Sequence, residues 1–228
     1  MGWGRAIEID NKIDPAKPFA VLLLNLGGPD SIASIRPFLQ NLFSDKSIIK
    51  LPLQPLTARL IARSRAKKVA ARYLAIGGGS PILKLTREQA KGVEENLNKA
   101  GLKCRAYVGM SYWHPFIYEA IDQIVKDGYE QVVAVSLFPQ YSAATSGACL
   151  MELQSVVKKK ASHLKEAVIQ SWHDDPGYLD ALAASIKEGL EKTGDNPTIL
   201  FSAHGLPEDF VARGDPYPQH LEETIKGV

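Results

Sequence analysis

Short apolar runs alternate along the chain with longer segments whose apolar residues recur every three or four positions. Continuous apolar runs of this kind are typical of strands covered on both faces, and the helical spacing predicts helices packed against them. The predicted strands are residues 19–26, 105–110, 132–138, 167–172 and 198–203. Strands that alternate with helices of these lengths predict an α/β fold with a mainly parallel sheet.

Several residues mark where the predicted helices begin and end. Thr86 and Gln89 have the spacing of a capping box, which predicts a helix start at Thr86. Pro115 is expected to open the next helix, and the periodicity predicts a further helix over residues 147–160. Glycines are expected to close three of the helices: Gly101, Gly128 and Gly194.

Composition narrows the class of protein without naming a function. The 228 residues include 27 Lys and Arg against 25 Asp and Glu, so a net charge of +2 gives no global field that favours nucleic acid. Cys104 and Cys149 are too few for a disulfide framework or a four-cysteine metal site. No apolar run approaches membrane-spanning length, and the first ten residues lack the apolar core of a signal peptide. We expect a cytoplasmic protein.

Polar and small residues gather where the predicted strands end. In open parallel sheets, ligands bind outside the carboxyl ends of the strands, and these ends share one rim. The four rim segments here are Asn25–Pro29, Ser111–His114, Phe138–Ser142 and Ser202–Gly205. They bring aromatic rings and two histidines together, which suits a large planar apolar ligand with a proton or a metal to move.

Each histidine also has a structural interpretation. His204 follows a predicted strand and serves either as a catalytic group or as a hydrogen-bonded structural residue. His114 precedes Pro115 and could simply mark a helix entry. The other three histidines stand in polar context and are expected at the surface: His163, His173 and His220. Because no two histidines have helical metal-ligand spacing, a preformed zinc site is not predicted.

Two further segments carry candidate chemistry. Residues 77–81 (GGGSP) lack the lysine of a phosphate-binding loop, so a sharp turn that presents Ser80 is the favoured interpretation. Residues 56–74 form a basic helix candidate with Arg59 and Arg63 on one line. Three interpretations of this helix stay open: a solvated face, a membrane-surface helix, or a lip that attracts the carboxylates of a ligand.

Taken together, these motifs resemble the ferrochelatases, enzymes that insert ferrous iron into a porphyrin in haem biosynthesis. The resemblance extends from about residue 19 to residue 228. It is carried, in order, by VLLLNLGGPD, RPFLQNLFSD, RYLAIGGGSPILKLTREQA, YVGMSYWHPF, LFPQYSAATSG, FSAHGLP and RGDPYP.

The resemblance implies a chelatase fold of two similar Rossmann-like halves with the porphyrin between them. Residues 15–176 would form the first half, 177–194 a connecting helix, and 195–228 an incomplete start of the second half. The apolar turns LLLNLGGP and ILFSAHGLP fit such a repeat.

The resemblance also implies roles for single residues. His204 matches the family's invariant histidine, described as a ligand to the iron, an acceptor of the pyrrole protons, or both. An ordinary imidazole, with a pKa of about 6.5, is largely neutral near pH 7 and suits both roles. The implied porphyrin-binding residues are Arg72, Tyr73, Ser80, Tyr112, His114 and Tyr141.

The chain departs from the family pattern in one important respect. The segment that carries the family's second metal-site residue, a glutamate, has no counterpart among these residues. The implied activity is a lyase that takes Fe²⁺ and protoporphyrin or coproporphyrin as substrates, and the alternative is a porphyrin- or haem-binding fragment without catalysis. No permanently bound cofactor is expected, and Ala143 occupies the position of one iron–sulfur cysteine in some relatives, so no cluster is predicted. A nucleotide-binding oxidoreductase fits the Gly27–Pro29 turn poorly.

Overall fold

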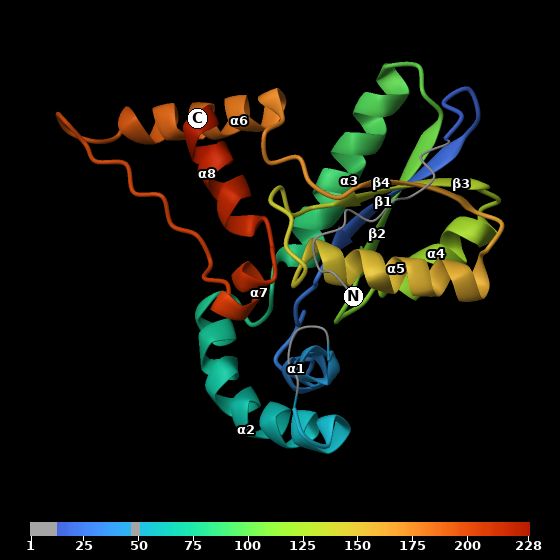
Figure 1. Ribbon diagram of the computed structural model, residues 1–228, viewed down its shortest axis with the longest axis horizontal. Coiled ribbons are helices and arrows are strands. Elements are labelled where there is room, and N and C mark those ends of the chain that lie inside the picture. The colour runs from blue at the N-terminus through green and yellow to red at the C-terminus, as the bar shows by residue number, and fades with distance from the viewer. Residues whose placement is uncertain (1–12, 47–50) are drawn as a thin grey trace.

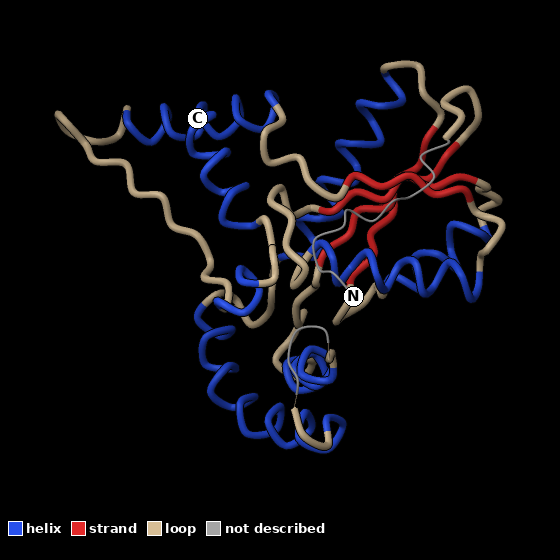
Figure 2. The backbone as a smooth tube through the Cα atoms, in the orientation of Figure 1, coloured by secondary structure: helices blue, strands red, loops and turns tan. Residues whose placement is uncertain are grey.

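A four-stranded parallel sheet organises the first three quarters of the chain. The structure is a computed structural model that describes residues 13–46 and 51–228. The strands are β1 (Phe19–Asn25), β2 (Cys104–Met110), β3 (Gln131–Ser136) and β4 (Lys165–Ile169), in the order β2-β1-β3-β4 (Figures 1 and 2). Four of the five predicted strands and the predicted parallel sheet are therefore confirmed.

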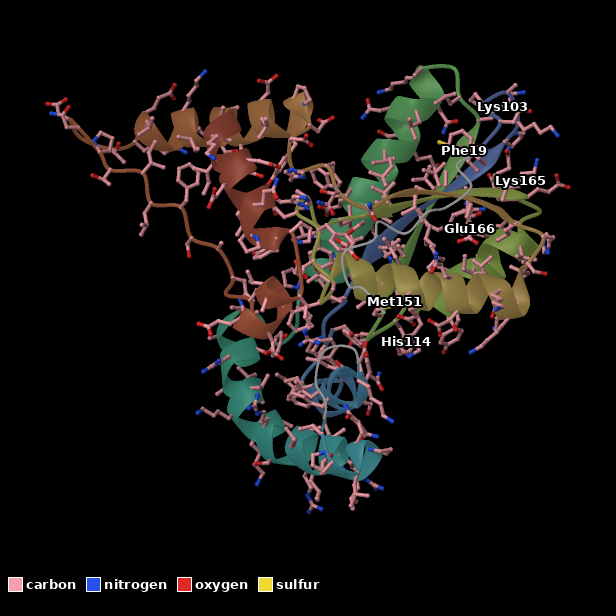
Figure 3. The ribbon with its side chains drawn as sticks, in the orientation of Figure 1. Phe19, Lys103, His114, Met151, Lys165 and Glu166 are labelled. Atoms are coloured by element: carbon pink, nitrogen blue, oxygen red, sulfur yellow. The ribbon has the colours of Figure 1, made fainter. Side chains whose placement is uncertain are left out.

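The strands run in one direction, which fixes where the candidate site lies. Figure 3 shows Phe19, Lys103 and Lys165 at one end of the sheet and His114 at the other. The carboxyl ends continue as hydrogen-bonded loops, since Ser111 N–H donates to the Asn25 carbonyl and Tyr112 N–H to the Leu26 carbonyl. Three of the four rim segments expected from the sequence thus follow strand ends that meet at one edge, and the fourth, Ser202–Gly205, does not follow a strand.

Helices cover both faces of the sheet because β1 is apolar on both. Leu22 and Leu24 pack with α4 (Ile117–Lys126) and α5 (Ser146–Lys160). Val21 and Leu23 face the opposite way, toward α3 (Ile82–Lys99). Burying a leucine or valine side chain completely contributes about 1.5–3 kcal/mol, so this central strand anchors both layers.

Two helices form a separate hairpin below the sheet (Figure 1). In α1 (Ile35–Ser44), Ile35, Leu39 and Phe43 pack against α2 (Gln54–Ala75). The contact face of α2 carries Ala58 and Ala62, both fully buried, and such small side chains let the two helix axes approach closely. The predicted basic helix over residues 56–74 is confirmed within α2.

The last quarter of the chain lies beside the sheet and contributes little to its core. It comprises α6 (Pro176–Leu190), α7 (Glu208–Ala212) and α8 (Tyr217–Gly227). Neither α6 nor α7 buries a side chain, and α8 buries only Thr224. This region is therefore held against the rest of the molecule mainly by polar contacts, which are described below.

The predicted strand over residues 198–203 is wrong. The segment is an extended loop between α6 and α7, and Leu200 is 88% exposed. A strand forms only where a neighbour supplies hydrogen bonds, and among the described residues no strand lies beside this segment. The segment has the apolar sequence of a buried strand, but none of the described strands pairs with it.

Three helix boundaries also differ from prediction. α3 starts at Ile82 after Pro81, so Thr86 is buried inside the helix and does not cap it. Phe116, not Pro115, is the N-cap residue of α4. The α6 helix ends at Leu190, before Gly194. Gly101 and Gly128 close their helices as predicted, with φ angles of 88° and 83°.

Candidate active site

His204 lies at the surface between two hollows at the carboxyl edge of the sheet. Its side chain belongs to the exposed loop before α7. The smaller hollow, of about 340 Å³, is lined by His204 together with Leu26, Phe138 and Tyr217. The larger, of about 580 Å³, is lined by His204, Phe201 and residues of α6 and α8. The imidazole is thus accessible and faces mainly apolar walls.

Small residues bring two predicted turns together near this rim. Ser80 N–H donates to the Pro29 carbonyl at 2.7 Å, and Ser80 Oγ accepts from Ile82 N–H at 3.3 Å. A Cβ atom on Gly28 would lie 2.7 Å from Ser80 Oγ, so only glycine fits there. Ser80 is presented by a sharp turn as predicted, and Gly28 makes room for Ser80 itself.

Tyr112 and His114 both have protein partners. The Tyr112 ring is buried, and its hydroxyl donates to Asp45 at 2.6 Å; burial, with the Asp45 contact second, raises the pKa of Tyr112 strongly. His114 is exposed, and its Nδ1 lies 2.9 Å from both carboxylate oxygens of Glu119. Although burial opposes it, hydrogen bonds from His114 and Phe116 N–H hold the pKa of Glu119 below its usual range.

Arg72 and Tyr73 belong to the last turn of α2. Arg72 is exposed, and Tyr73 is half-buried against the α1–α2 contact, where burial raises its pKa. Of the predicted porphyrin-binding residues, none lines either hollow that His204 lines. Their roles stay predictions.

Tyr141 comes nearest to the His204 hollow, because it lies between two residues of its wall, Gln140 and Ser142. The ring is half-buried, and burial, with the charge of Asp215 second, raises its pKa. A Cβ atom on Gly147 would lie 2.8 Å from the Tyr141 hydroxyl, so α5 admits the ring only because glycine stands there.

Residues of α8 and of the loop before it hold the Tyr141 loop in place. Buried Asp215 accepts from Ala143 N–H at 2.8 Å and from the Ser142 hydroxyl at 3.0 Å. His220 Nδ1 accepts from Tyr141 N–H at 3.1 Å. The Gln140 side-chain amide donates to Thr224 Oγ1 at 3.0 Å. We call these contacts the polar seam.

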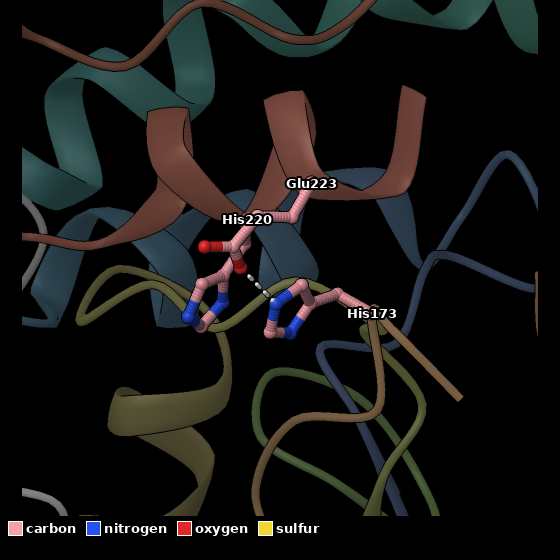
Figure 4. Close-up of side chains that lie close together, drawn as sticks. All are labelled: His173, His220 and Glu223. Atoms are coloured by element: carbon pink, nitrogen blue, oxygen red, sulfur yellow. Dashed lines mark hydrogen bonds and ion pairs between the residues drawn. The ribbon is translucent and has the colours of Figure 1, made fainter. Parts of the chain in front are cut away.

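A second histidine joins the polar seam, contrary to expectation. His173 is 8% exposed, and its ring stacks on that of His220 with centroids 3.7 Å apart and planes 5° apart (Figure 4). His173 Nε2 lies 2.6 Å from a Glu223 carboxylate oxygen. The prediction that His173 and His220 are ordinary surface groups is wrong, because α8 folds back over the loop that follows β4.

These three side chains are close enough to suggest a metal centre, since one ligand atom from each lies within 4.8 Å of the others. The ring geometry argues against it. A histidine binds a metal through a lone pair in its ring plane, and two nearly parallel rings with centroids 3.7 Å apart direct their lone pairs past a common ion. His220 Nδ1 is also occupied by Tyr141 N–H.

Sequence reasoning missed Asp215, His173, His220 and Glu223. The available signal was the spacing of His220, Glu223 and Thr224, which places three polar groups on one helix face. Such a face indicates docking onto a polar loop, but the sequence does not say which loop.

Comparison with known proteins identifies the family. The sequence model of one family, Ferrochelatase, matches residues 18–228. The chain belongs to the ferrochelatase family. The resemblance stated from the sequence motifs is therefore confirmed, and so is the α/β fold class.

Individual ferrochelatases match at substantial identity. The chain is 46% identical over 214 residues to the ferrochelatase of Geotalea daltonii, covering 92% of this chain and 66% of that protein. Identity is 46% to the Gloeothece citriformis ferrochelatase, with 90% and 55% covered, and 43% to that of Aquifex aeolicus, with 90% and 66% covered. The chain thus spans between about half and two thirds of the length of these ferrochelatases.

No helix within the described residues combines the length and apolar character needed to cross a bilayer.

Proposed function

We propose that the whole protein is a ferrochelatase, a lyase that inserts Fe²⁺ into a porphyrin in haem biosynthesis, with His204 at the reacting centre. Membership of the ferrochelatase family supports the reaction. The observation that carries the assignment to His204 is its accessible ring on an apolar hollow at the carboxyl edge of the sheet.

The chemistry explains why one exposed imidazole matters. Two pyrrole N–H protons must leave the macrocycle for each Fe²⁺ that enters, so the reaction needs a base close to the ring nitrogens. A neutral imidazole has one free lone pair, so His204 can hold the iron or accept a proton but cannot do both at once. His204 therefore binds Fe²⁺ first, and as the metal passes to the ring nitrogens it accepts one of the two pyrrole protons, while the other passes to water.

The remaining walls supply binding rather than bond chemistry. Leu26, Phe138 and Leu206 give the smaller hollow an apolar lining, and Tyr217 adds an aromatic ring to it. Flat aromatic and aliphatic surfaces are the expected partners of a macrocycle face. Tyr141 would contribute from the adjoining loop, and Arg72 would pair with a propionate.

The test is His204→Ala in the full protein. Iron insertion is expected to fall by a factor on the order of 10²–10⁴, because the variant lacks the base and iron ligand. Porphyrin binding, followed by the Soret shift, should persist because the apolar walls are unchanged. His163→Ala is the matched control, since that histidine is exposed and remote from both hollows. Wild-type turnover in His204→Ala would refute the assignment.

We also propose that α2 contacts a membrane surface peripherally, in a cytoplasmic protein. Leu56, Leu60, Arg63 and Lys67 fall within one arc of the helix, opposite the face that packs on α1. Leu56 and Leu60 are 57% and 58% exposed. Exposed leucines flanked by cations on a helix surface favour the interface of an anionic bilayer.

A further inference from the structure

The backbone of Tyr141 depends on one unprotonated nitrogen. His220 Nδ1 lies 3.1 Å from Tyr141 N, and a backbone N–H can only donate. His220 Nδ1 must therefore present a lone pair, which assigns the ring proton to Nε2 and leaves the ring neutral. A proton added to Nδ1 would replace this hydrogen bond by two donors facing each other.

The surroundings of His220 resist that added proton. The ring is partly buried and stacked on His173 at 3.7 Å. Three carboxylates face it as well, Asp174, Asp215 and Glu223, and these favour the proton. Burial, and next to it the charge of His173, outweigh the carboxylates and lower the pKa of His220 below its usual 6.5.

His173 extends the contact beyond α8. Its Nε2–H donates to Glu223, because a carboxylate can only accept, and its Nδ1 lies 2.8 Å from Ser171 Oγ. The Thr224 hydroxyl donates to the His173 carbonyl at 2.9 Å. The stacked rings thus join α8, the loop after β4, and the Tyr141 loop (Figure 4).

This junction connects two walls of the smaller hollow that His204 lines. Gln140, Ser142 and Thr145 of the Tyr141 loop line that hollow, and Tyr217 from the first turn of α8 lines it too. Because His220 lies one turn after Tyr217 on α8, its bond to Tyr141 fixes the spacing between these two walls.

We propose that His220 is a proton-sensitive positioning residue that holds the Tyr141 loop against α8 and releases it when the ring takes up a proton. A group whose native pKa lies below its unfolded value stabilises the native contact above the unfolded pKa, and this contribution is lost as the pH falls. The contact is therefore complete above about pH 6.5 and weakens progressively below it.

The primary experiment needs neither porphyrin nor iron, and it uses the 228-residue chain. Hydrogen exchange of the Tyr141 amide is measured by NMR between pH 7.5 and pH 4.5 and corrected for intrinsic exchange. Protection should fall by up to about tenfold per pH unit as the pH drops from about 6.5 to the native pKa of His220, and it should level off below that pKa. Protection that does not change with pH would overturn the proposal.

Two variants separate protonation from packing. His220→Asn retains an acceptor near the position of Nδ1 and cannot take up the proton, so Tyr141 protection should persist and lose its pH dependence. His163→Asn, the matched control at an exposed histidine, should behave like wild type. A pH dependence retained in His220→Asn would contradict the role of His220.

A measurement on the unmodified chain guards against a variant that fails to fold. Nitrogen chemical shifts of the His220 ring at pH 7.5 should show the proton on Nε2, and a proton on Nδ1 would overturn the proposal.

The link to the candidate site rests on the proposed function and has its own readout. In the full protein, the KM for porphyrin should rise as the pH falls below about 6.5 in wild type and change less in His220→Asn. Absence of any chelatase activity would refute the proposed function and leave the exchange result standing. Equal pH profiles of KM in both proteins would refute the link alone.

Discussion

Asp215 connects two segments of the chain, the Tyr141 loop and the start of α8, through one carboxylate. One oxygen accepts from Ala143 N–H and the Ser142 hydroxyl, and the other accepts from Tyr217 N–H at 3.1 Å. Because Asp215 is 6% exposed, water cannot readily replace these bonds. A buried donor that loses its acceptor costs about 1–3 kcal/mol.

We therefore expect Asp215→Ala to destabilise the protein by about 1–3 kcal/mol, measured by urea unfolding followed by circular dichroism. Asp209→Ala is the matched control, since its carboxylate pairs with Arg213 at 2.8 Å on the surface, where such pairs contribute about 0–1 kcal/mol. Equal stability of Asp215→Ala and Asp209→Ala would show that the polar seam does not need this carboxylate.

The sequence was least able to predict which single residues belong to the candidate site. His204 could be singled out because a histidine after an apolar run and before Gly205 is conspicuous. His173 and His220 could not, because 47 residues separate them and only the fold stacks their rings. Contacts between distant segments leave no periodic pattern for sequence reasoning to detect.

Among the elements, α2 is distinguished by two faces of different composition. The face toward α1 carries buried alanines, and the opposite face carries exposed leucines beside arginines. These exposed leucines, which pack on no other element among the described residues, are the basis of the proposed contact with a membrane surface.

We expect the 228-residue chain to sediment with vesicles that contain phosphatidylglycerol and to do so less with neutral vesicles. Leu56→Glu with Leu60→Glu should reduce binding at least about tenfold, because each leucine buried in the interface contributes about 1.5–3 kcal/mol and each new charge repels the anionic lipid. Leu85→Glu is the matched control, with a leucine 50% exposed on α3. Vesicle binding that is unchanged in the double variant would reject α2 as the contact.

Element prediction succeeded where burial and periodicity agree. The apolar run of β1 and the helical spacing in α4 each have one stable interpretation, because both elements bury residues against the sheet. It failed at residues 198–203, where the pattern of a strand is present but no strand of the described part of the chain lies beside it.

At the scale of the molecule, residues 198–203 form an exposed apolar edge. Ile199, Leu200 and Phe201 are 48%, 88% and 47% exposed in an extended backbone. An extended apolar segment with unpaired backbone groups is a template for pairing with another chain. Figure 1 shows this segment on the side of α6 and α8 that faces away from the sheet.

We therefore expect the 228-residue chain to self-associate as its concentration rises, measured by sedimentation equilibrium. Leu200→Lys should weaken association about tenfold or more, because burying a leucine contributes about 1.5–3 kcal/mol. Val211→Lys, at a residue 45% exposed on α7, is the matched control. A monomeric wild type at high concentration, or equal association of the two variants, would refute this prediction.

The polar seam has a consequence for how the molecule comes apart. The polar seam is expected to yield to acid and urea sooner than the leucines around β1 do, because α8 buries only Thr224 and few apolar contacts support these hydrogen bonds. The two sides of the hollow would therefore part while all four strands are still in register. In acid or urea, such a protein would lose the geometry of the His204 hollow first and its four-stranded sheet only later.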